Sequence, residues 1–314
     1  MFLKSQHLLG IRDLPSETIS IILKTAVKFR KALESGIKKN PKLNGKTVIN
    51  AFFEPSTRTR SSFEVAAKKL GADSINFNAS TSSISKGESL KDTGLTLQAM
   101  RPDVLVLRHP HSGAPAYLSR YCNKTHIING GDGINEHPTQ ALLDAMTILD
   151  HKKSLTGILV AIVGDIAHSR VARSNVLLLR KMGATVRVCG PPTLIPDGFE
   201  MIYGAKVTFN LSKALKDADV VMMLRTQWER QNEVYFPSIR EYSRLFGLTE
   251  KKMKIAKRNA IVMHPGPINR GVEFDPQMAD GHYSVILDQV SNGVALRMAL
   301  LSLILGKEEG IKGS

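Results

Sequence analysis

Cysteine is almost absent from this chain of 314 residues, which contains only Cys122 and Cys189. Two thiols cannot build a disulfide framework, and neither lies in a CxxC or clustered Cys/His pattern that would bind zinc. We therefore expect a protein of a reducing, cytoplasmic compartment that holds no metal ion.

Long hydrophobic runs are missing too. The N-terminal sequence MFLKSQHLLG has no uninterrupted apolar stretch and no small-residue cleavage pattern, so we expect no signal peptide. The most apolar segment, residues 284–305, is interrupted by Asp288 and Arg297. Because a membrane-spanning helix needs a continuous apolar stretch, we expect this segment to pack on protein, with no membrane partner.

Acidic and aromatic residues are both scarce. The chain has 28 Asp and Glu against 43 Lys and Arg, a formal charge of +15, and only 6% aromatic residues. A basic surface could serve nucleic acid or small polyanionic substrates. Because there are no RGG repeats and no regular Lys/aromatic interleaving to stack bases, we expect no nucleic-acid partner. The 42% hydrophobic content excludes a disordered chain.

Short apolar runs alternate with helical patterns along the chain. The runs predict buried strands at residues 48–53, 74–77, 104–107, 126–128, 159–163, 185–189, 220–223 and 260–263. Helices are expected at residues 16–34, 61–70, 90–100, 114–120, 138–150, 169–182 and 284–305. This alternation predicts an α/β fold with two doubly wound parallel-sheet domains.

The domain boundaries follow from where the alternation stops and restarts. We expect a first domain over residues 1–137, an interdomain helix over 138–150 and a second domain over 151–284. A C-terminal helix over residues 285–314 is expected to return to the first domain.

The densest cluster of anion-binding groups follows the first expected strand. Five consecutive residues carry three hydroxyls and two guanidiniums: Ser56, Thr57, Arg58, Thr59 and Arg60. They lie between a strand and a helix, where free backbone N–H groups and the positive helix end point to one place. A helix cap beside a solvated arginine pair needs only one hydroxyl, so the pattern favours a phosphate site.

Two further polar segments lie where strands of the first half end. Arg108 directly follows the strand at 104–107, and His137 follows a glycine-rich loop at residues 130–133. Open α/β sheets bind ligands outside the carboxyl ends of their strands, so both residues are expected at a ligand site. Gln140 lies three residues after His137, and both side chains can face the same cleft.

The second half shows the same arrangement after three strands. Arg170 follows the strand at 159–163, and Arg225 and Gln227 follow the strand at 220–223. The residues around Arg170 lack the GxGxxG pattern, which argues against a dinucleotide site. After the strand at 260–263, two prolines around Gly266 fix a turn that can offer carbonyls to a ligand amide.

These motifs resemble those of the aspartate carbamoyltransferase family. Five separated motifs agree with the family in order and spacing across residues 54–270, and the full length also fits. A polar loop at residues 82–88, which on its own is typical of an exposed connection, falls at a further functional position of the family. The implied reaction transfers the carbamoyl group from carbamoyl phosphate to the α-amine of L-aspartate, in de novo pyrimidine biosynthesis.

The resemblance also implies residue roles. Carbamoyl phosphate would be bound by Ser56, Thr57, Arg58, Thr59, Arg108, His137, Gln140, Gly266 and Pro267. Aspartate would be bound by Lys86, Arg170, Arg225 and Gln227. The catalytic set would be Arg58, Thr59, Lys86, Arg108 and His137. Ser82 and Lys86 would come from the adjacent subunit of a homotrimer, and no metal or organic cofactor would be needed.

The charges of these residues fit the two substrates. Carbamoyl phosphate is close to a dianion and aspartate brings two carboxylates, so the site must gather about four negative charges. The implied cations are Arg58, Lys86, Arg108, Arg170 and Arg225. Such a balance is what a site for two polyanions requires.

Two alternative functions fit the sequence less well. The ornithine carbamoyltransferase family shares the STRTR and HPTQ motifs, but the cation of ornithine would be repelled by Arg225 beside Arg170. That family also has a cysteine in the motif matching residues 264–267, where this chain has none. A basic nucleic-acid-binding protein would leave the five motifs without a role. The sequence leaves open whether a regulatory chain or a dihydroorotase-like partner joins the homotrimer.

Overall fold

The computed structural model describes residues 7–36, 40–78, 87–227 and 238–306. Two compact units are distinguished, Met1–Leu142 with Ser291–Ser314, and Leu143–Val290. Two long helices contain the boundaries between them: α5 (Pro138–Lys152) and α12 (Ile286–Leu305). The C-terminal helix therefore contributes residues 291–305 to the first unit.

A four-stranded parallel sheet forms the centre of the first unit. Its strands are β1 (Thr47–Phe52), β2 (Asp73–Asn78), β3 (Val104–His109) and β4 (His126–Asp132), in the order β2-β1-β3-β4. Its helices are α1 (Ser16–Glu34), α2 (Thr57–Lys69), α3 (Leu90–Ala99) and α4 (Ala114–Ser119). Because all four strands run in the same direction, their carboxyl ends lie at one edge of the sheet.

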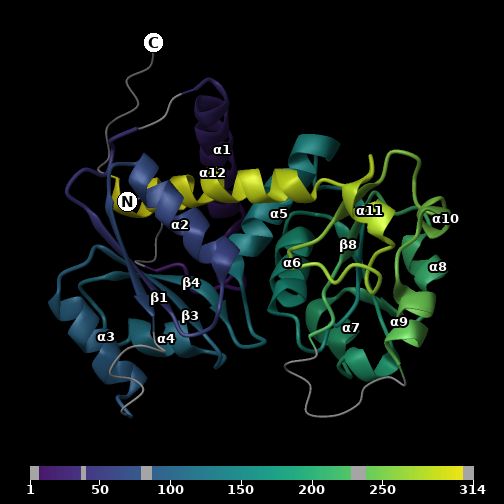
Figure 1. Ribbon diagram of the computed structural model, residues 1–314, viewed down its shortest axis with the longest axis horizontal. Helices are drawn as coiled ribbons and strands as arrows, with labels where there is room; N and C mark the ends of the chain where they lie inside the picture. Colours follow the sequence, from purple (N-terminus) through teal and green to yellow (C-terminus); the bar gives the residue numbers. More distant parts are fainter. Residues whose placement is uncertain (1–6, 37–39, 79–86, 228–237, 307–314) are drawn as a thin grey trace. The chain divides into compact units, whose positions relative to one another are not determined.

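One face of this sheet is covered by α3 and α4. Leu105 and Leu107 of β3 pack with Leu97 of α3 and Leu118 of α4, and Figure 1 shows these two helices below the strands. Because side chains alternate along a strand, the remaining residues of β3 face the opposite layer. There α2 contacts β1 and β2 and buries Phe63 completely.

A five-stranded parallel sheet forms the centre of the second unit. Its strands are β5 (Leu159–Val163), β6 (Thr185–Cys189), β7 (Lys206–Thr208), β8 (Val220–Met223) and β9 (Ile261–Met263), in the order β7-β6-β5-β8-β9. Its helices are α6 (Arg170–Lys181), α7 (Phe199–Tyr203), α8 (Leu211–Leu215), α9 (Ile239–Phe246), α10 (Glu250–Met253) and α11 (Pro276–Asp280), with a 3₁₀ turn η3 (Pro192–Leu194).

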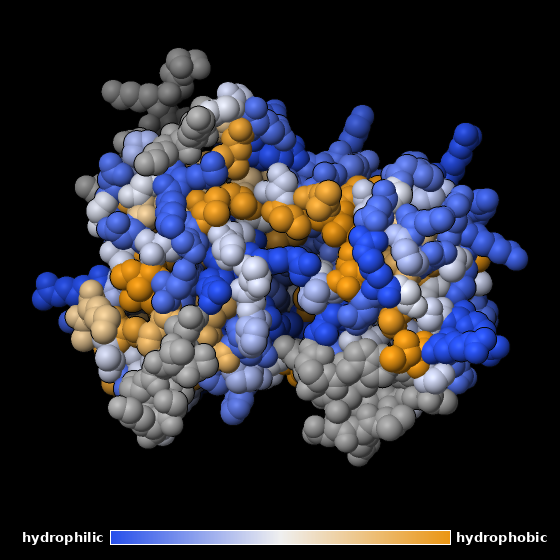
Figure 2. All heavy atoms as spheres, in the orientation of Figure 1, coloured by the Kyte–Doolittle hydropathy of each residue, from blue (hydrophilic) through white to orange (hydrophobic). Residues whose placement is uncertain are grey.

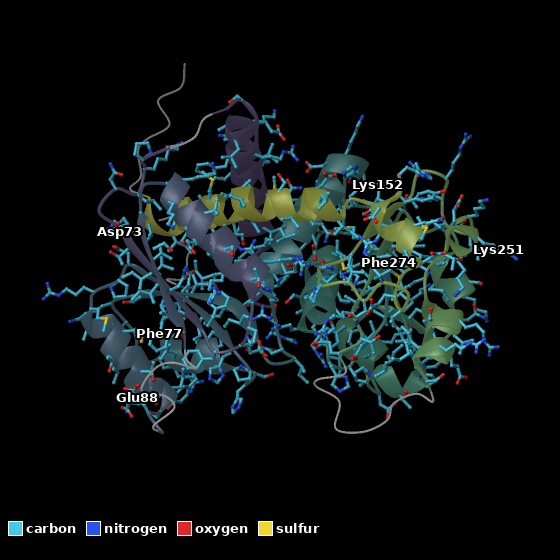
Figure 3. The ribbon with its side chains drawn as sticks, viewed as in Figure 1. Asp73, Phe77, Glu88, Lys152, Lys251 and Phe274 are labelled. Atoms are coloured by element: carbon cyan, nitrogen blue, oxygen red, sulfur yellow. The ribbon has the colours of Figure 1, made fainter. Side chains whose placement is uncertain are left out.

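One buried cluster of the second unit lies on one face of its sheet. Met223 of β8 lies in the same buried cluster as Tyr242 of α9 and Phe274. Figure 3 shows Phe274 inside this unit, whereas Lys251 of α10 points into solvent. Each large apolar side chain that is buried in this way stabilises the fold by about 1.5–3 kcal/mol.

Helix α12 has apolar side chains that are exposed near its start and apolar side chains that are buried further along. Figure 2 shows hydrophobic side chains gathered along it, where Leu287 and Val290 are 82% and 49% exposed. Further along the helix, Ala295, Leu296 and Leu300 are completely buried. Within the residues that the structure describes, we find no helix with the length and apolarity needed to cross a membrane.

The expected fold class is confirmed, with two parallel-sheet α/β units. Three local expectations were wrong. Residues 130–132, which were expected in a glycine-rich loop, form the end of β4 (His126–Asp132). Helix α2 begins at Thr57 and not at residue 61, so the phosphate-binding motif forms the first turn of the helix. Strand β7 and helices α7 to α11 were not expected, since these elements are only three to eight residues long.

Both cysteines should be unreactive in the folded protein. Cys122 and Cys189 are fully buried, and burial raises the pKa of the Cys189 thiol to about 12. At pH 8 only about one thiol in 10⁴ would then be a thiolate, the reactive form. A colorimetric thiol reagent should therefore titrate no cysteine before denaturant is added. Modification of Cys189 within minutes at pH 8, located by peptide mass mapping, would show that the end of β6 opens.

Candidate active site

The order of strands in the first unit creates a natural ligand site. The chain runs from β1 to β2 at one edge of the sheet and returns to β3 on the other side of β1. Ligands of open parallel sheets bind where the order reverses, outside the carboxyl ends of the strands. Here Phe52 pairs with Arg108, and the Phe53 N–H donates to the Arg108 carbonyl at 2.8 Å. The STRT motif and Arg108 therefore leave the sheet side by side.

The N-terminus of α2 is prepared for an anion. Ser56 is its N-cap residue, with φ −160° and ψ 98°, and its side chain makes no capping hydrogen bond. The first turn contains no acidic residue, and Thr57 and Arg58 are exposed. Unpaired backbone N–H groups and the helix dipole favour negative charge at this end. A phosphate group can therefore bind backbone, hydroxyls and guanidinium together.

Arg108 is held at the same edge by two oxygens. Its Nη1 donates to the Gly130 carbonyl at 3.5 Å, and its Nε lies 3.4 Å from Oε2 of Glu54. The side chains of Arg108 and Glu54 are only 15% and 16% exposed. Glu54 had no role in the sequence interpretation, although it belongs to the motif itself. The pair orients the guanidinium and partly balances its charge.

His137 approaches the STRT motif from the end of β4. Its Nε2 lies 3.4 Å from Oγ1 of Thr59, with the two residues 4% and 6% exposed. The His137 carbonyl accepts the N–H of Gln140 at 3.0 Å, in the turn that starts α5. Thr59, Arg108 and His137 thus occupy the carboxyl ends of β1, β3 and β4. Of the predicted carbamoyl phosphate ligands in the first unit, Thr59 and His137 are brought within 3.4 Å, and Arg108 lies on the strand next to the one that leads into the STRT motif.

The second unit has its own switch point, between β5 and β8. The chain runs from β5 outward to β6 and β7, then returns to β8 beside β5. Arg170, which is 4% exposed, opens α6 after β5, and Arg225 follows β8. The Ser169 side chain caps α6 by accepting the Ala172 N–H at 3.1 Å. Both predicted aspartate-binding arginines therefore lie at the ligand edge of this sheet.

Asp165 ties these two segments together. This fully buried carboxylate accepts the His168 backbone N–H at 3.0 Å, and lies 2.9 Å from His168 Nδ1. It also accepts the Gln227 N–H at 3.4 Å. The Gln227 side-chain amide in turn donates to the His168 carbonyl at 2.9 Å. In this arrangement Gln227 links two strand ends, so binding aspartate would require its amide to turn.

A second buried carboxylate joins Arg225 to the proline-rich turn. Glu273 accepts the Thr226 N–H at 3.1 Å and the Asn269 N–H at 2.8 Å. Burial raises the pKa of the Glu273 carboxyl, while the hydrogen bonds from Thr226 and Asn269 oppose the shift. Within the turn, His264 Nδ1 accepts the Gly266 N–H at 2.8 Å. The backbone on both sides of Gly266 is thus fixed by side chains.

Three acidic residues of these sites escaped sequence reasoning: Glu54, Asp165 and Glu273. Each lies within or next to a recognised motif, but its partner is distant in sequence, by 47 residues in the case of Glu273 and Thr226. A carboxylate inside a motif rich in arginine was the available signal. Asp and Glu are seldom buried unless paired, so such residues point to a charge-balanced site.

Two predicted site residues, Ser82 and Lys86, lie outside the described residues. Over residues 7–36, 40–78, 87–227 and 238–306, no group of three or more His, Cys, Asp or Glu side chains could hold a metal ion.

Family models match both halves of the chain. Residues 6–150 match the carbamoyl-P binding domain of aspartate/ornithine carbamoyltransferase, and residues 156–304 match the Asp/Orn binding domain. The chain belongs to the aspartate/ornithine carbamoyltransferase family. The two matches divide the chain between the two sheets, with β1 to β4 in the first and β5 to β9 in the second.

Curated relatives distinguish the two branches of this family. The chain is 56% identical over 309 residues to the aspartate carbamoyltransferase catalytic subunit of Syntrophotalea carbinolica, covering 98% of each chain. It is also 56% identical over 301 residues to the subunit of the same name from Syntrophobacter fumaroxidans, covering 96% of this chain and 98% of that one.

Solved structures agree on the fold but do not separate the branches. Aspartate transcarbamoylase from Trypanosoma cruzi, in complex with carbamoyl phosphate and aspartate, matches with a TM-score of 0.85 and 30% identity over 95% of this chain and 96% of that one. Ornithine carbamoyltransferase from Pyrococcus furiosus matches with a TM-score of 0.84 and 32% identity, over the same shares. Aspartate is favoured by the closer sequence relatives, not by the fold.

Proposed function

We propose that this chain is an aspartate carbamoyltransferase. It transfers the carbamoyl group from carbamoyl phosphate to the α-amine of L-aspartate, giving N-carbamoyl-L-aspartate and phosphate in de novo pyrimidine biosynthesis. The observation that carries the proposal is the 56% identity, over 98% of each chain, to a catalytic subunit of that name. The placement of arginines at the ligand edges of both sheets agrees with it.

The first unit would bind carbamoyl phosphate. The N-terminus of α2, with Ser56, Thr57 and Arg58, would hold the phosphate. Arg108, Thr59 and His137 would contact the carbamoyl oxygen, since Thr59 and His137 already lie within 3.4 Å of each other. Gln140 would hold the carbamoyl amide.

The second unit would bind aspartate. Arg170 and Arg225 are forked cations that can each bind a carboxylate with two parallel hydrogen bonds. Glu273 and Asp165 hold the backbone that directly follows Arg225, by accepting the Thr226 and Gln227 N–H groups. The site is therefore rigid where the guanidinium must be aimed.

The chemistry follows from this placement. The aspartate amine attacks the carbamoyl carbon, and a tetrahedral intermediate forms that expels phosphate. Negative charge develops on the carbamoyl oxygen, where Arg108, Thr59 and His137 would supply donors. Holding both substrates in line removes much of the entropic barrier. No covalent nucleophile is required, and both cysteines are fully buried.

Substrate choice is tested directly with purified chain. Carbamoyl transfer from carbamoyl phosphate should be measured with aspartate and with ornithine at equal concentrations. Transfer to aspartate is expected, since ornithine would bring its cation to Arg170 and Arg225. Transfer to ornithine alone would assign the chain to the other branch of the family.

A conservative change at Arg225 should separate binding from chemistry in the second unit. Arg225→Lys keeps the charge but loses the fork, so the KM for aspartate should rise by about 10- to 100-fold. The KM for carbamoyl phosphate should stay the same. Arg258→Lys, at an exposed position of the same unit, is the control and should change neither constant. Equal weakening of both substrates would show that Arg225 does not bind aspartate.

We further propose a cytoplasmic homotrimer in which Ser82 and Lys86 complete the site of the adjacent subunit. Lys86 brings the proposed site cations to five, against about four negative charges on the two substrates. A closed ring of three chains is the simplest assembly with head-to-tail contacts in which every chain offers this loop to the next.

A further inference from the structure

The N-terminal segment, residues 7–12, lies along the outer edge of β4. Leu8 forms a parallel bridge with Ile128. The Leu8 N–H donates to the Ile127 carbonyl at 2.9 Å, and the Leu8 carbonyl accepts the Asn129 N–H at 2.8 Å. Leu8 and Ile11 are 1% and 0% exposed. The segment therefore extends the sheet on the side that leads to His137.

Glu136, the residue before His137, holds this segment. Its Oε2 accepts the Ile11 N–H at 2.7 Å, and its Oε1 accepts the Arg12 N–H at 3.3 Å. The Glu136 backbone is fixed as well, because its N–H donates to Oδ1 of Asp132 at 3.1 Å and its carbonyl accepts the Asp132 N–H at 3.1 Å. Glu136 is only 5% exposed, and both its side chain and its backbone are held by hydrogen bonds.

Gly10 makes this approach possible. A Cβ at position 10 would lie 2.4 Å from Oε1 of Glu136 and 2.9 Å from its Cδ. Gly10 does not have a positive φ, so the requirement is for space and not for a special backbone conformation. A side chain at position 10 would push the Glu136 carboxylate, and the peptide that leads to His137, out of place.

We propose that Glu136 is a positioning residue for His137, acting through its contact with residues 10–12. The inference rests on the proposed function, since it assigns His137 to the carbamoyl oxygen. His137 is 4% exposed and lies 3.4 Å from Thr59, so it has little freedom to recover from a shift of the preceding residue. A displacement of about 1 Å in a catalytic group can cost about 100-fold in rate.

A double-mutant cycle tests the coupling. Gly10→Ala should lower kcat by about 10- to 100-fold with little change in the KM for aspartate. Glu136→Ala should lower kcat similarly, because the buried Ile11 N–H and the partly buried Arg12 N–H lose the carboxylate that accepts them. In the Glu136→Ala background, Gly10→Ala should cause no further loss, since the atoms it would meet are gone. Glu136→Gln, which keeps an acceptor oxygen for Ile11, should retain most of the activity.

A matched control distinguishes a displacement of His137 from a general loss of stability. Gly45→Ala changes a glycine of the same unit that has φ +73° and no atom within 4 Å. It should lower the melting temperature through backbone strain and leave kcat unchanged. The imidazole resonances of His137, assigned with His137→Gln, should shift in Gly10→Ala and not in Gly45→Ala.

The outcomes distinguish this inference from the proposed function. If the wild-type chain carbamoylates no aspartate, the function is wrong, and the His137 resonances alone decide the coupling. If the wild type is active but Gly10→Ala keeps the wild-type kcat and His137 resonances, the inference is overturned. Additive losses in the double mutant would also overturn it.

Discussion

Arg108→Ala should lower kcat/KM for carbamoyl phosphate by about 10³-fold, since it removes a donor to the developing oxyanion. The change also leaves Glu54 without the guanidinium that lies 3.4 Å from its carboxylate. The Glu54 carboxylate, only 16% exposed, would then repel the substrate phosphate with one neighbouring cation fewer to offset its charge. Loss of attraction and gain of repulsion act together, and steady-state kinetics with varied carbamoyl phosphate measure the sum.

The two contributions can be separated. Adding Glu54→Gln to Arg108→Ala removes the repulsion. The double mutant should therefore have a kcat/KM about tenfold higher than that of Arg108→Ala alone. Arg120→Ala removes the same charge from an exposed position of the same unit and should leave kcat/KM within a factor of about two. If Arg120→Ala were as damaging as Arg108→Ala, net charge alone would explain the effect. If Arg108→Ala kept full activity, Arg108 would not contact the substrate.

The main strands and long helices could be predicted because each has its own local pattern of apolar residues, either at helical spacing or in a continuous run. The helix expected at residues 16–34 is α1 (Ser16–Glu34), where Ile19, Ile22 and Leu23 repeat at helical spacing and are buried. Strand β5 was also placed correctly, since it is a continuous apolar run that a fully buried parallel strand requires.

Short elements could not be predicted, because their stability comes from packing. Strand β7 has three residues, and only its pairing with β6 defines it. Helix α8 has five residues and is capped by Asn210, whose side chain accepts the Lys213 N–H at 3.1 Å. An isolated helix of this length is unstable in water, and five residues are too few to show a helical pattern in the sequence.

The positions of Arg108 and Arg225 at strand ends could be predicted, but not the groups that surround them. Arg108 and Arg225 were found because each directly follows an apolar run, and the carboxyl ends of parallel strands share one edge. Glu136 and Gly10 were not found, since they are 126 positions apart in the sequence and meet only when β4 pairs with residues 7–12. Local motifs indicate which polar residues lie at strand ends, and the order of the strands decides which distant residues pack against them.

The second large effect concerns the proposed sharing of each site between subunits. Lys86→Ala and His137→Ala should each be nearly inactive, because one removes a proposed aspartate-binding cation and the other a donor to the carbamoyl oxygen. If Lys86 acts in the neighbour's site, an intact site needs a chain that keeps His137 next to one that keeps Lys86. Co-refolding of the two inactive proteins can create such pairs, whereas neither protein alone can.

Mixing the two variants in equal amounts allows the recovered activity to be calculated. Among random trimers roughly three quarters contain both chains, and each of these has one intact site in three, so activity should reach about one quarter of the wild type. The recovered sites should have the wild-type KM for aspartate, because every group in them is native. The control is a mixture of Lys86→Ala with Lys86→Ala/His137→Ala, which contains no complementary pair and should stay inactive. Mixed trimers confirmed by mass that remain as inactive as their parents would exclude the shared site, because Lys86 and His137 would then serve the same chain.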